Sequence, residues 1–89
     1  MRIEFDLTKD AANLAKHGVS LALAVELDWE AALVWVDDRF EYGKSRMIAL
    51  ALKTSILYYV AFVERGEVRR PISLRRANRR EVKRYVQSV

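Results

Sequence analysis

In the second half of the chain the apolar residues recur at every second position, a spacing that predicts β-strands. Four strands are expected, over residues 31–37, 46–53, 56–63 and 67–75. The turns at 53–55 and 64–66 are short, and short connections join antiparallel neighbours. The second and third of these strands are apolar on both sides, so we expect them at the centre of the sheet. Pro71 cannot donate a ladder hydrogen bond, which predicts an edge or a bulge in the last strand.

The N-terminal part of the chain predicts a short strand followed by two helices. Residues 2–6 alternate in character, and the apolar members should face inward. A helical pattern then covers residues 7–17, where Asp6 suits the N-cap and Gly18 suits a C-terminal position with positive φ. Ser20 is a suitable N-cap for the second helix.

Asn78 and Glu81 predict the start of a final helix, because an N-cap residue followed three positions later by a carboxylate forms a capping box. Apolar stripes at helical spacing are Ala11, Leu14 and Ala15 in the first helix, and Val82, Tyr85, Val86 and Val89 in the last. The element order is therefore β-α-α-β-β-β-β-α. We predict one α+β domain over residues 1–89, with a mostly antiparallel sheet packed against helices.

Composition excludes several classes of protein. The chain has 89 residues and a net charge of +4. It lacks cysteine, which excludes disulfides, thiolate catalysis and cysteine-based zinc sites, and its single histidine excludes a multi-histidine metal centre. The sequence shows neither an apolar run of membrane length nor a signal-peptide pattern, so no membrane partner is expected. The absence of cysteine is compatible with the reducing cytoplasm.

The positive charge is concentrated near the C-terminus. Residues 64–89 hold nine Lys and Arg against three Asp and Glu, a balance of +6 that leaves −2 for residues 1–63. Eight of the nine are arginines, which favour planar, bidentate contacts to phosphate. Nucleic acid is the first partner that this charge indicates, and an acidic protein is the second. A plain solvated face is the remaining interpretation.

Alternation along the last strand predicts which side chains share its open face. One set is Arg69, Pro71, Ser73 and Arg75. The other set, which is more apolar and should meet the helices, is Val68, Arg70, Ile72 and Leu74. The adjoining helix start carries further arginines, and the whole cluster is Arg75, Arg76, Arg79 and Arg80. Positive charge at a helix N-terminus opposes the helix dipole, so this cluster suggests an anionic partner.

Other candidates for chemistry are spread along the chain. His17 is the one side chain expected to titrate near neutrality, so it can be a general acid or base, or a helix-end cap. Arg39 and Arg46 can contact a substrate or pair with nearby acidic residues. Lys53 should be exposed at a strand end, and Tyr85 can either take part in chemistry or pack in the core. Cleavage of RNA without a metal needs a base for the 2′-hydroxyl, cations for the phosphate and an acid for the leaving 5′-oxygen.

Three motifs resemble the BrnT family. They are Phe5-Asp6-x-x-Lys9-x-x-x-Asn13-x-x-Lys16-His17-Gly18-Val19-Ser20, Asp38-Arg39-x-x-Tyr42-Gly43-x-x-Arg46, and Arg70-Pro71-Ile72-Ser73-Leu74-Arg75-Arg76-Ala77 followed by Glu81 and Tyr85. The resemblance covers nearly the whole chain. It implies a RelE-like fold and a ribonuclease toxin of a type II toxin–antitoxin pair, which arrests translation without a metal or other cofactor.

The resemblance also implies partners and site residues. The partners are an RNA substrate and a BrnA-like antitoxin, whose ribbon-helix-helix part binds operator DNA, so that DNA is reached only through the antitoxin. With this resemblance, the expected catalytic residues are His17, Arg46, Arg75 and Tyr85. The expected RNA-binding residues are Arg39, Lys53, Arg69, Ser73, Arg76, Arg79 and Arg80. The alternatives are a non-catalytic nucleic-acid-binding module of the same fold and a protein-interaction domain.

Overall fold

The computed structural model describes residues 1–39 and 45–88. In chain order the elements are β1 (Arg2–Ile3), α1 (Leu7–His17), the 3-10 helix η1 (Leu21–Glu26), β2 (Leu33–Val36), β3 (Met47–Lys53), β4 (Ile56–Arg65), β5 (Val68–Arg76) and α2 (Arg79–Ser88). The predicted element order and α+β class are confirmed. The motif positions Tyr42 and Gly43 lie outside the described residues.

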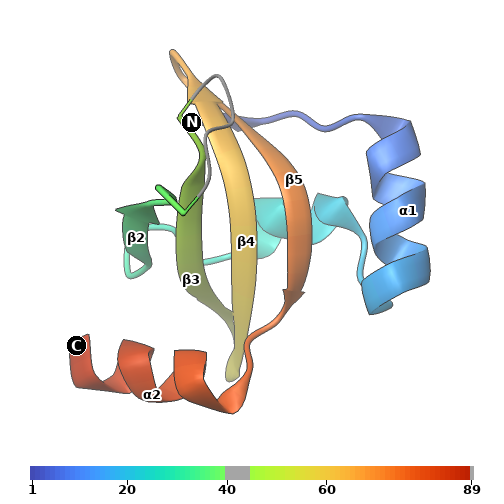
Figure 1. The fold of residues 1–89 in the computed structure, drawn as a ribbon. Coiled ribbons are helices and arrows are strands. Elements are labelled where there is room, and N and C mark those ends of the chain that lie inside the picture. The colour runs from blue at the N-terminus through green and yellow to red at the C-terminus, as the bar shows by residue number, and fades with distance from the viewer. Residues whose placement is uncertain (40–44, 89) are drawn as a thin grey trace.

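The described strands form one sheet in the order β1-β5-β4-β3-β2 (Figure 1). All neighbouring pairs are antiparallel except β1 with β5, which is parallel. β3 and β4 lie inside the sheet, as their two-sided apolar sequences predicted. β1 pairs only with Val68 and Arg69, so β5 becomes an edge strand just before Pro71. A proline is tolerated there because no neighbour needs its missing N–H.

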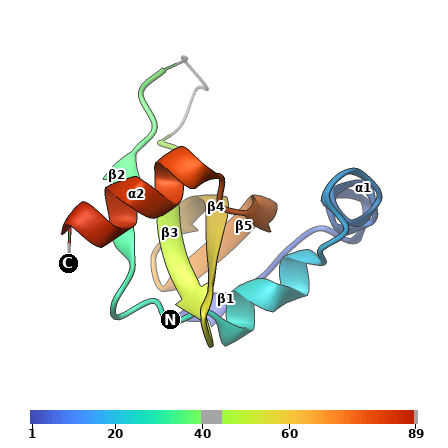
Figure 2. The same cartoon turned by 90° about the horizontal axis from the view of Figure 1, so that it is seen from below.

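Helices cover the two faces of the sheet separately (Figure 2). η1 packs on one face and α2 packs on the other, and we call these the η1 face and the α2 face. The core on the η1 face consists of Leu21, Ala24, Leu27, Ala49, Ala51, Val60, Phe62 and Leu74. The core on the α2 face consists of Leu50, Leu57 and Tyr85.

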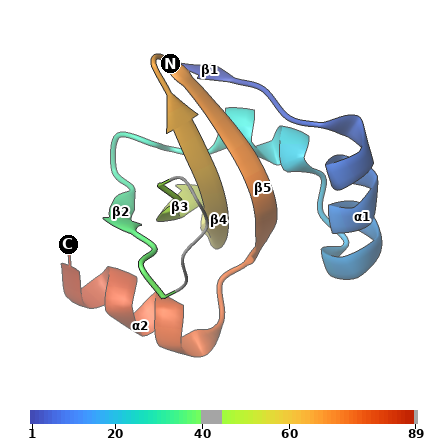
Figure 3. The same ribbon diagram turned by 45° about the horizontal axis from the view of Figure 1, so that its top comes forward.

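α1 lies beyond the β5 edge rather than over either face of the sheet (Figures 1 and 3). The predicted N-cap is confirmed, since Asp6 accepts a hydrogen bond from the Lys9 N–H, and Gly18 has the expected positive φ of 72°. The apolar stripe of this helix is exposed, and its buried residue is Asn13. At a sheet edge the available partners are backbone groups, so a polar side chain makes the contact.

α2 begins with the predicted capping box. Asn78 Oδ1 accepts from the Glu81 N–H at 2.8 Å, and Glu81 Oε1 accepts from the Asn78 N–H at 2.9 Å. Of the predicted stripe, Tyr85 is buried, whereas Val82 and Val86 are exposed. Val89 lies outside the described residues.

A bulge interrupts β5 beside its proline. Ser73 pairs with Ala61 while Pro71 pairs with Phe62, so Ile72 is an extra residue between the two pairs. Both expectations raised by Pro71, an edge and a bulge, are therefore confirmed. Such an insertion reverses the alternation of side chains along the strand that carries it.

The bulge corrects the predicted faces of β5. Ser73 and Arg75 lie with Arg70 on the α2 face, whereas Arg69 lies with Leu74 on the η1 face. The prediction that Arg69 shares a face with Ser73 and Arg75 was wrong, and so was the grouping of Arg70 with Leu74. Side chains alternate between the two faces of a sheet only up to an inserted residue, and beyond it the assignment of faces is reversed.

Candidate active site

Asn13 joins α1 to the edge of β5. Its Nδ2 donates to the Leu74 carbonyl oxygen at 2.8 Å, and its Oδ1 accepts from the Leu74 N–H at 3.0 Å. Nδ2 also donates to the Val19 carbonyl oxygen at 2.8 Å, which fixes the loop after the helix. His17 follows Asn13 by four residues and so lies on the same side of α1. The amide thereby places His17 beside β5.

A hollow of about 360 Å³ lies between α1 and the α2 face of the sheet. We call it the His17 hollow, and its lining is Lys9, Ala12, Asn13, Lys16, His17, Arg46, Ala61, Ile72 and Ser73. Three of the predicted site residues, His17, Arg46 and Ser73, meet here. The lining combines an imidazole and a hydroxyl with the cations Lys9, Lys16 and Arg46, a setting that attracts phosphate.

His17 is partly buried, and this desolvation lowers its pKa below the usual 6.5. The positive charges of Lys16 and Arg75 lower the pKa further. At pH 7 the imidazole is therefore neutral and able to accept a proton. Arg75 follows Ser73 by two residues on the same face of β5, which places that arginine next to the hollow.

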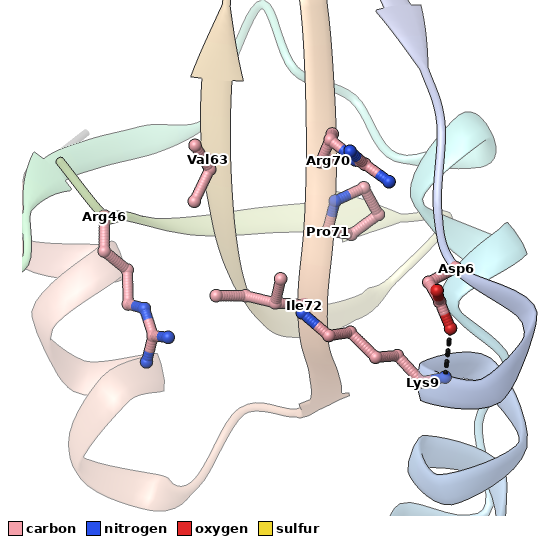
Figure 4. A pocket seen from close by; sticks show the side chains of 7 residues that line it. All are labelled: Asp6, Lys9, Arg46, Val63, Arg70, Pro71 and Ile72. Carbon is pink, nitrogen blue, oxygen red and sulfur yellow. Dashed lines mark hydrogen bonds between the residues drawn. The ribbon is translucent and has the colours of Figure 1, made fainter. Parts of the chain in front are cut away.

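A smaller pocket of about 150 Å³ adjoins the His17 hollow (Figure 4). Lys9, Arg46 and Ile72 line both spaces. Lys9 reaches from α1 toward β5 beside Ile72, and Arg46 extends from the start of β3 over the same face (Figure 4). Arg70 adds another cation to the pocket. The two spaces thus share a positively charged wall along β5.

Arg75 is held between Glu81 and Tyr59. Its Nη1 and Nη2 donate to the two Glu81 carboxylate oxygens at 2.8 and 2.9 Å, and its Cζ lies 4.0 Å from the centre of the Tyr59 ring. Nη1 also donates to the Arg76 carbonyl oxygen at 3.2 Å. The side edge formed by Nε–H and the second Nη2–H makes no hydrogen bond to any described residue. Such an edge fits two oxygens of a phosphate.

Glu81 is ionised in this arrangement. Partial burial raises its pKa, but hydrogen bonds from the Arg75 side chain and the Asn78 backbone, with the charge of Arg75, bring the pKa below its usual 4.5. The hydrogen bond to Glu81 in turn raises the pKa of Arg75. One carboxylate therefore caps α2 and orients Arg75.

A third space, of about 250 Å³, lies between α2 and the neighbouring part of the sheet. We call it the Trp35 groove, and its lining is Trp35, Arg39, Ile48, Tyr59, Arg80, Glu81 and Arg84. Arg39 and Arg80, two of the predicted RNA-binding residues, lie here. Arg39 forms a two-pronged ion pair with the buried Asp37, with Nε–Oδ1 at 2.7 Å and Nη2–Oδ2 at 2.9 Å.

Two predicted RNA-binding residues lie away from these spaces. Arg69 is on the η1 face, with its Cζ 4.7 Å from the centre of a Trp29 ring and its Nε 2.7 Å from Glu64 Oε2. Lys53 pairs with Glu26 of η1 at 3.0 Å. Their contacts are those of surface residues on the opposite side of the sheet from His17.

The remaining predicted residues are Arg76, Arg79 and Tyr85. Arg76 and Arg79 are exposed around the start of α2. Tyr85 is buried against the sheet, and its hydroxyl donates to the Ala31 carbonyl oxygen at 3.0 Å. The structure therefore brings His17, Arg46 and Ser73 together, places Arg75 beside them, and leaves Tyr85 in the core.

Sequence reasoning missed five residues of the site, namely Lys9, Lys16, Tyr59, Glu81 and Arg84. The capping-box spacing identified Glu81 as a cap, and the same carboxylate was a natural partner for a nearby arginine. Lys9 and Lys16 stand in the first motif, eight residues and one residue before His17 on the helix. Nothing in the sequence singled out Tyr59. Its strand is apolar on both faces, so the pattern does not show which tyrosine reaches the open face.

Cationic side chains predominate around the His17 hollow and its neighbouring pocket. Within residues 1–39 and 45–88, no three His, Asp or Glu side chains are grouped in a way that could hold a metal ion. In the same part of the chain, no helix has both the length and the apolar character that crossing a membrane demands.

Comparison with known proteins identifies the family. A family model described as the ribonuclease toxin BrnT of type II toxin–antitoxin systems matches residues 5–81. No curated protein matches the chain. The matched span contains all residues of the His17 hollow together with Arg75 and Glu81. The chain therefore belongs to the BrnT family of ribonuclease toxins.

Proposed function

We propose that this chain is an endoribonuclease that cleaves RNA without a metal ion and arrests translation. The observation that carries the proposal is the position of the His17 imidazole in a cation-lined hollow, with Arg75 clamped beside it by Glu81. A base, a cationic surface and an anchored guanidinium are the groups that attack by a 2′-hydroxyl on its own phosphate requires.

In the proposed reaction, His17 accepts the proton of the 2′-hydroxyl. The 2′-oxygen bonds to phosphorus, the bond from phosphorus to O5′ breaks, and O5′ takes a proton from the ammonium of Lys9 or Lys16 or from solvent. The products are a 2′,3′-cyclic phosphate and a 5′-hydroxyl. The step changes no oxidation state and needs no co-reactant.

Arg75 has the geometry to stabilise the charge on the phosphate. Its side edge can donate two parallel hydrogen bonds to non-bridging oxygens, while Glu81 prevents the guanidinium from turning away. Arg46 and the Ser73 hydroxyl face the same hollow and assist in binding. Tyr85 is not part of the proposed set, because its hydroxyl already donates to a backbone carbonyl in the core.

Cleavage of end-labelled RNA by the purified chain tests this proposal. We expect products with a 2′,3′-cyclic phosphate, formed equally well with and without a chelator. His17→Gln and Arg75→Gln should each lower the rate by about a hundredfold or more, whereas Lys53→Gln, on the other side of the sheet, should not. Loss of activity in the chelator would contradict the metal-free reaction. Salt-sensitive RNA binding with no cleavage would identify a non-catalytic module instead.

We propose further that a BrnA-like antitoxin neutralises this activity in the cytoplasm and carries the contacts to operator DNA through its ribbon-helix-helix part. Membership of a type II toxin–antitoxin family supports a dedicated protein partner. Induction of the chain alone should stop growth, and co-expression of the neighbouring small gene should restore it. Induction of Arg75→Gln should be harmless. Growth arrest by Arg75→Gln as strong as that by the unaltered chain would separate toxicity from RNA cleavage.

A further inference from the structure

The Trp35 groove holds an arginine laid on an aromatic ring. The Cζ of Arg84 is 3.9 Å from the centre of the Trp35 ring, so the guanidinium covers the ring closely. Trp35 packs against the core of the α2 face, which fixes the ring in place. Arg84 itself is exposed. A guanidinium held over the ring at this distance, with its outer side in solvent, can serve as a stacking platform.

The groove also carries an excess of positive charge. The Asp37 carboxylate is only 2% exposed and is balanced by Arg39, and the Glu81 carboxylate is balanced by Arg75. Hydrogen bonding to Asp37, followed by the charge of Asp37 and interaction with Tyr59, raises the pKa of Arg39 and keeps it cationic. Arg80 and Arg84 then add positive charge beyond these two ion pairs.

Arg75 connects the groove with the His17 hollow. Its guanidinium lies on Tyr59 and pairs with Glu81, which both line the groove. Two residues before it on the same face of β5 is Ser73, which lines the hollow. A phosphate held by Arg75 would therefore lie at the boundary of the two spaces, and an adjoining nucleotide would reach into the groove.

We propose that the Trp35 groove is a subsite for one unpaired nucleotide of the RNA, with the base stacked on the guanidinium of Arg84 and the phosphate met by the surrounding arginines. This rests on the proposed function, because it extends the same RNA site. Single-stranded RNA is commonly bound by stacking of splayed bases on aromatic rings or guanidinium planes, combined with cationic contacts to the backbone. Both elements are present here in one cavity of about 250 Å³.

The test measures binding of two probes that cannot be cleaved. One is a five-nucleotide RNA with every 2′-hydroxyl methylated, and the other is the same backbone without bases. The ratio of their dissociation constants reports the contribution of the bases. Arg84→Glu, which removes the platform and leaves an acidic side chain near Trp35, is compared with Lys83→Glu, which makes the same charge change at an exposed neighbouring residue.

We expect the unaltered chain to bind the base-bearing probe about tenfold more tightly, as one stacked base would give. Arg84→Glu should remove most of this ratio. Lys83→Glu should weaken both probes together and preserve it. Quenching of Trp35 fluorescence by the base-bearing probe, absent in Arg84→Glu, gives a second readout, with Trp29 on the η1 face as a constant background.

If the ratio of the two dissociation constants is the same in Arg84→Glu and in the unaltered chain, the subsite proposal is overturned. Weakened antitoxin binding by Arg84→Glu with unchanged RNA binding would also overturn it, and would assign the groove to a protein partner. If the ratio falls as expected but unmodified RNA is not cut, the subsite stands and the proposed ribonuclease reaction fails. The two proposals are therefore separable in one set of variants.

Discussion

The side chain of Asn13 and the backbone of Leu74, which is fully buried, exchange two hydrogen bonds, at 2.8 and 3.0 Å. The N–H and the carbonyl of Leu74 are thus both hydrogen-bonded by one side-chain amide, at a point where β1 no longer pairs with β5. The pair attaches α1, and with it His17, to the sheet. It links the stability of the N-terminal helix to the geometry of the proposed site.

Asn13→Ala should lower the free energy of unfolding by about 2–4 kcal/mol, because it leaves a buried N–H and a buried carbonyl without their partner. Urea unfolding followed by circular dichroism measures the change. Lys16→Ala, at an exposed position on the same helix, is the control and should cost less than about 0.5 kcal/mol. A similarly small loss in Asn13→Ala would mean that α1 is held mainly by other contacts.

Glu81→Gln and Glu81→Ala should separate the two roles of this carboxylate. Glutamine preserves the capping box but gives up the charged pair with Arg75, so kcat should fall about tenfold with little loss of stability. Alanine should lose the cap as well, at a further cost of about 1 kcal/mol in unfolding free energy. If both variants keep full kcat, Arg75 needs no anchor. If glutamine is as unstable as alanine, the cap depends on charge.

Because the chain has one histidine, NMR can follow its titration without assignment. The His17 pKa should lie below 6.5, owing first to partial burial and then to Lys16 and Arg75. Arg75→Gln should therefore raise the His17 pKa, as should Lys16→Gln. A pKa at or above 6.5 in the unaltered chain, or no change in either variant, would show that His17 is more solvated than the structure indicates.

The lowered pKa of His17 also sets the pH dependence of the reaction and of folding. As a general base, His17 must be neutral, so kcat/KM should rise with pH and level off above the lowered pKa of His17. Below 6.5 the unfolded chain binds the proton more readily than the folded chain, so stability should fall on acidification through this range. His17→Gln should remove both effects. A rate that increases toward acid pH would instead assign His17 the role of acid.

Arg46→Ala should weaken RNA binding and slow cleavage. Arg69→Ala should have only the small effect that the loss of one positive charge has on RNA binding. Arg46 lines both spaces beside β5, while Arg69 lies against Trp29 on the opposite face. Gel-shift titrations at two salt concentrations compare the variants. An equal loss in both would indicate that binding follows net charge rather than position.

The sequence predicted the elements well where the evidence was local. The strands, the Asp6 and Asn78 caps and the Gly18 helix end all depend on patterns within a few residues, and the structure confirms them. The predicted apolar stripes of the helices did not identify the buried residues as well. An apolar stripe marks a buried face only when the helix lies over a sheet, and α1 lies at an edge, where Asn13 makes the contact.

The site was predictable in its types of residue and not in its arrangement. Placing His17 beside Ser73 depends on Asn13 reaching a strand 61 residues later in the chain, which no local pattern shows. The face of Arg69 depended on the bulge, which Pro71 suggested without fixing its position. The contact of Arg75 with the Tyr59 ring also joins two strands, so it depends on the register between β4 and β5 rather than on a local sequence pattern.

The Ile72 bulge gives β5 two halves that are out of phase with each other. Deletion of that single residue would leave a regular ladder in which Pro71 still pairs with Phe62 and Ser73 with Ala61, so Ser73 and Arg75 would stay on the α2 face. Exchange of Ile72 for another apolar residue would preserve the phase. In the course of sequence drift, β5 should therefore accept the loss of a residue at Ile72, where a deletion removes only the bulge, more readily than at a paired position such as Arg70, where a deletion would shift the register.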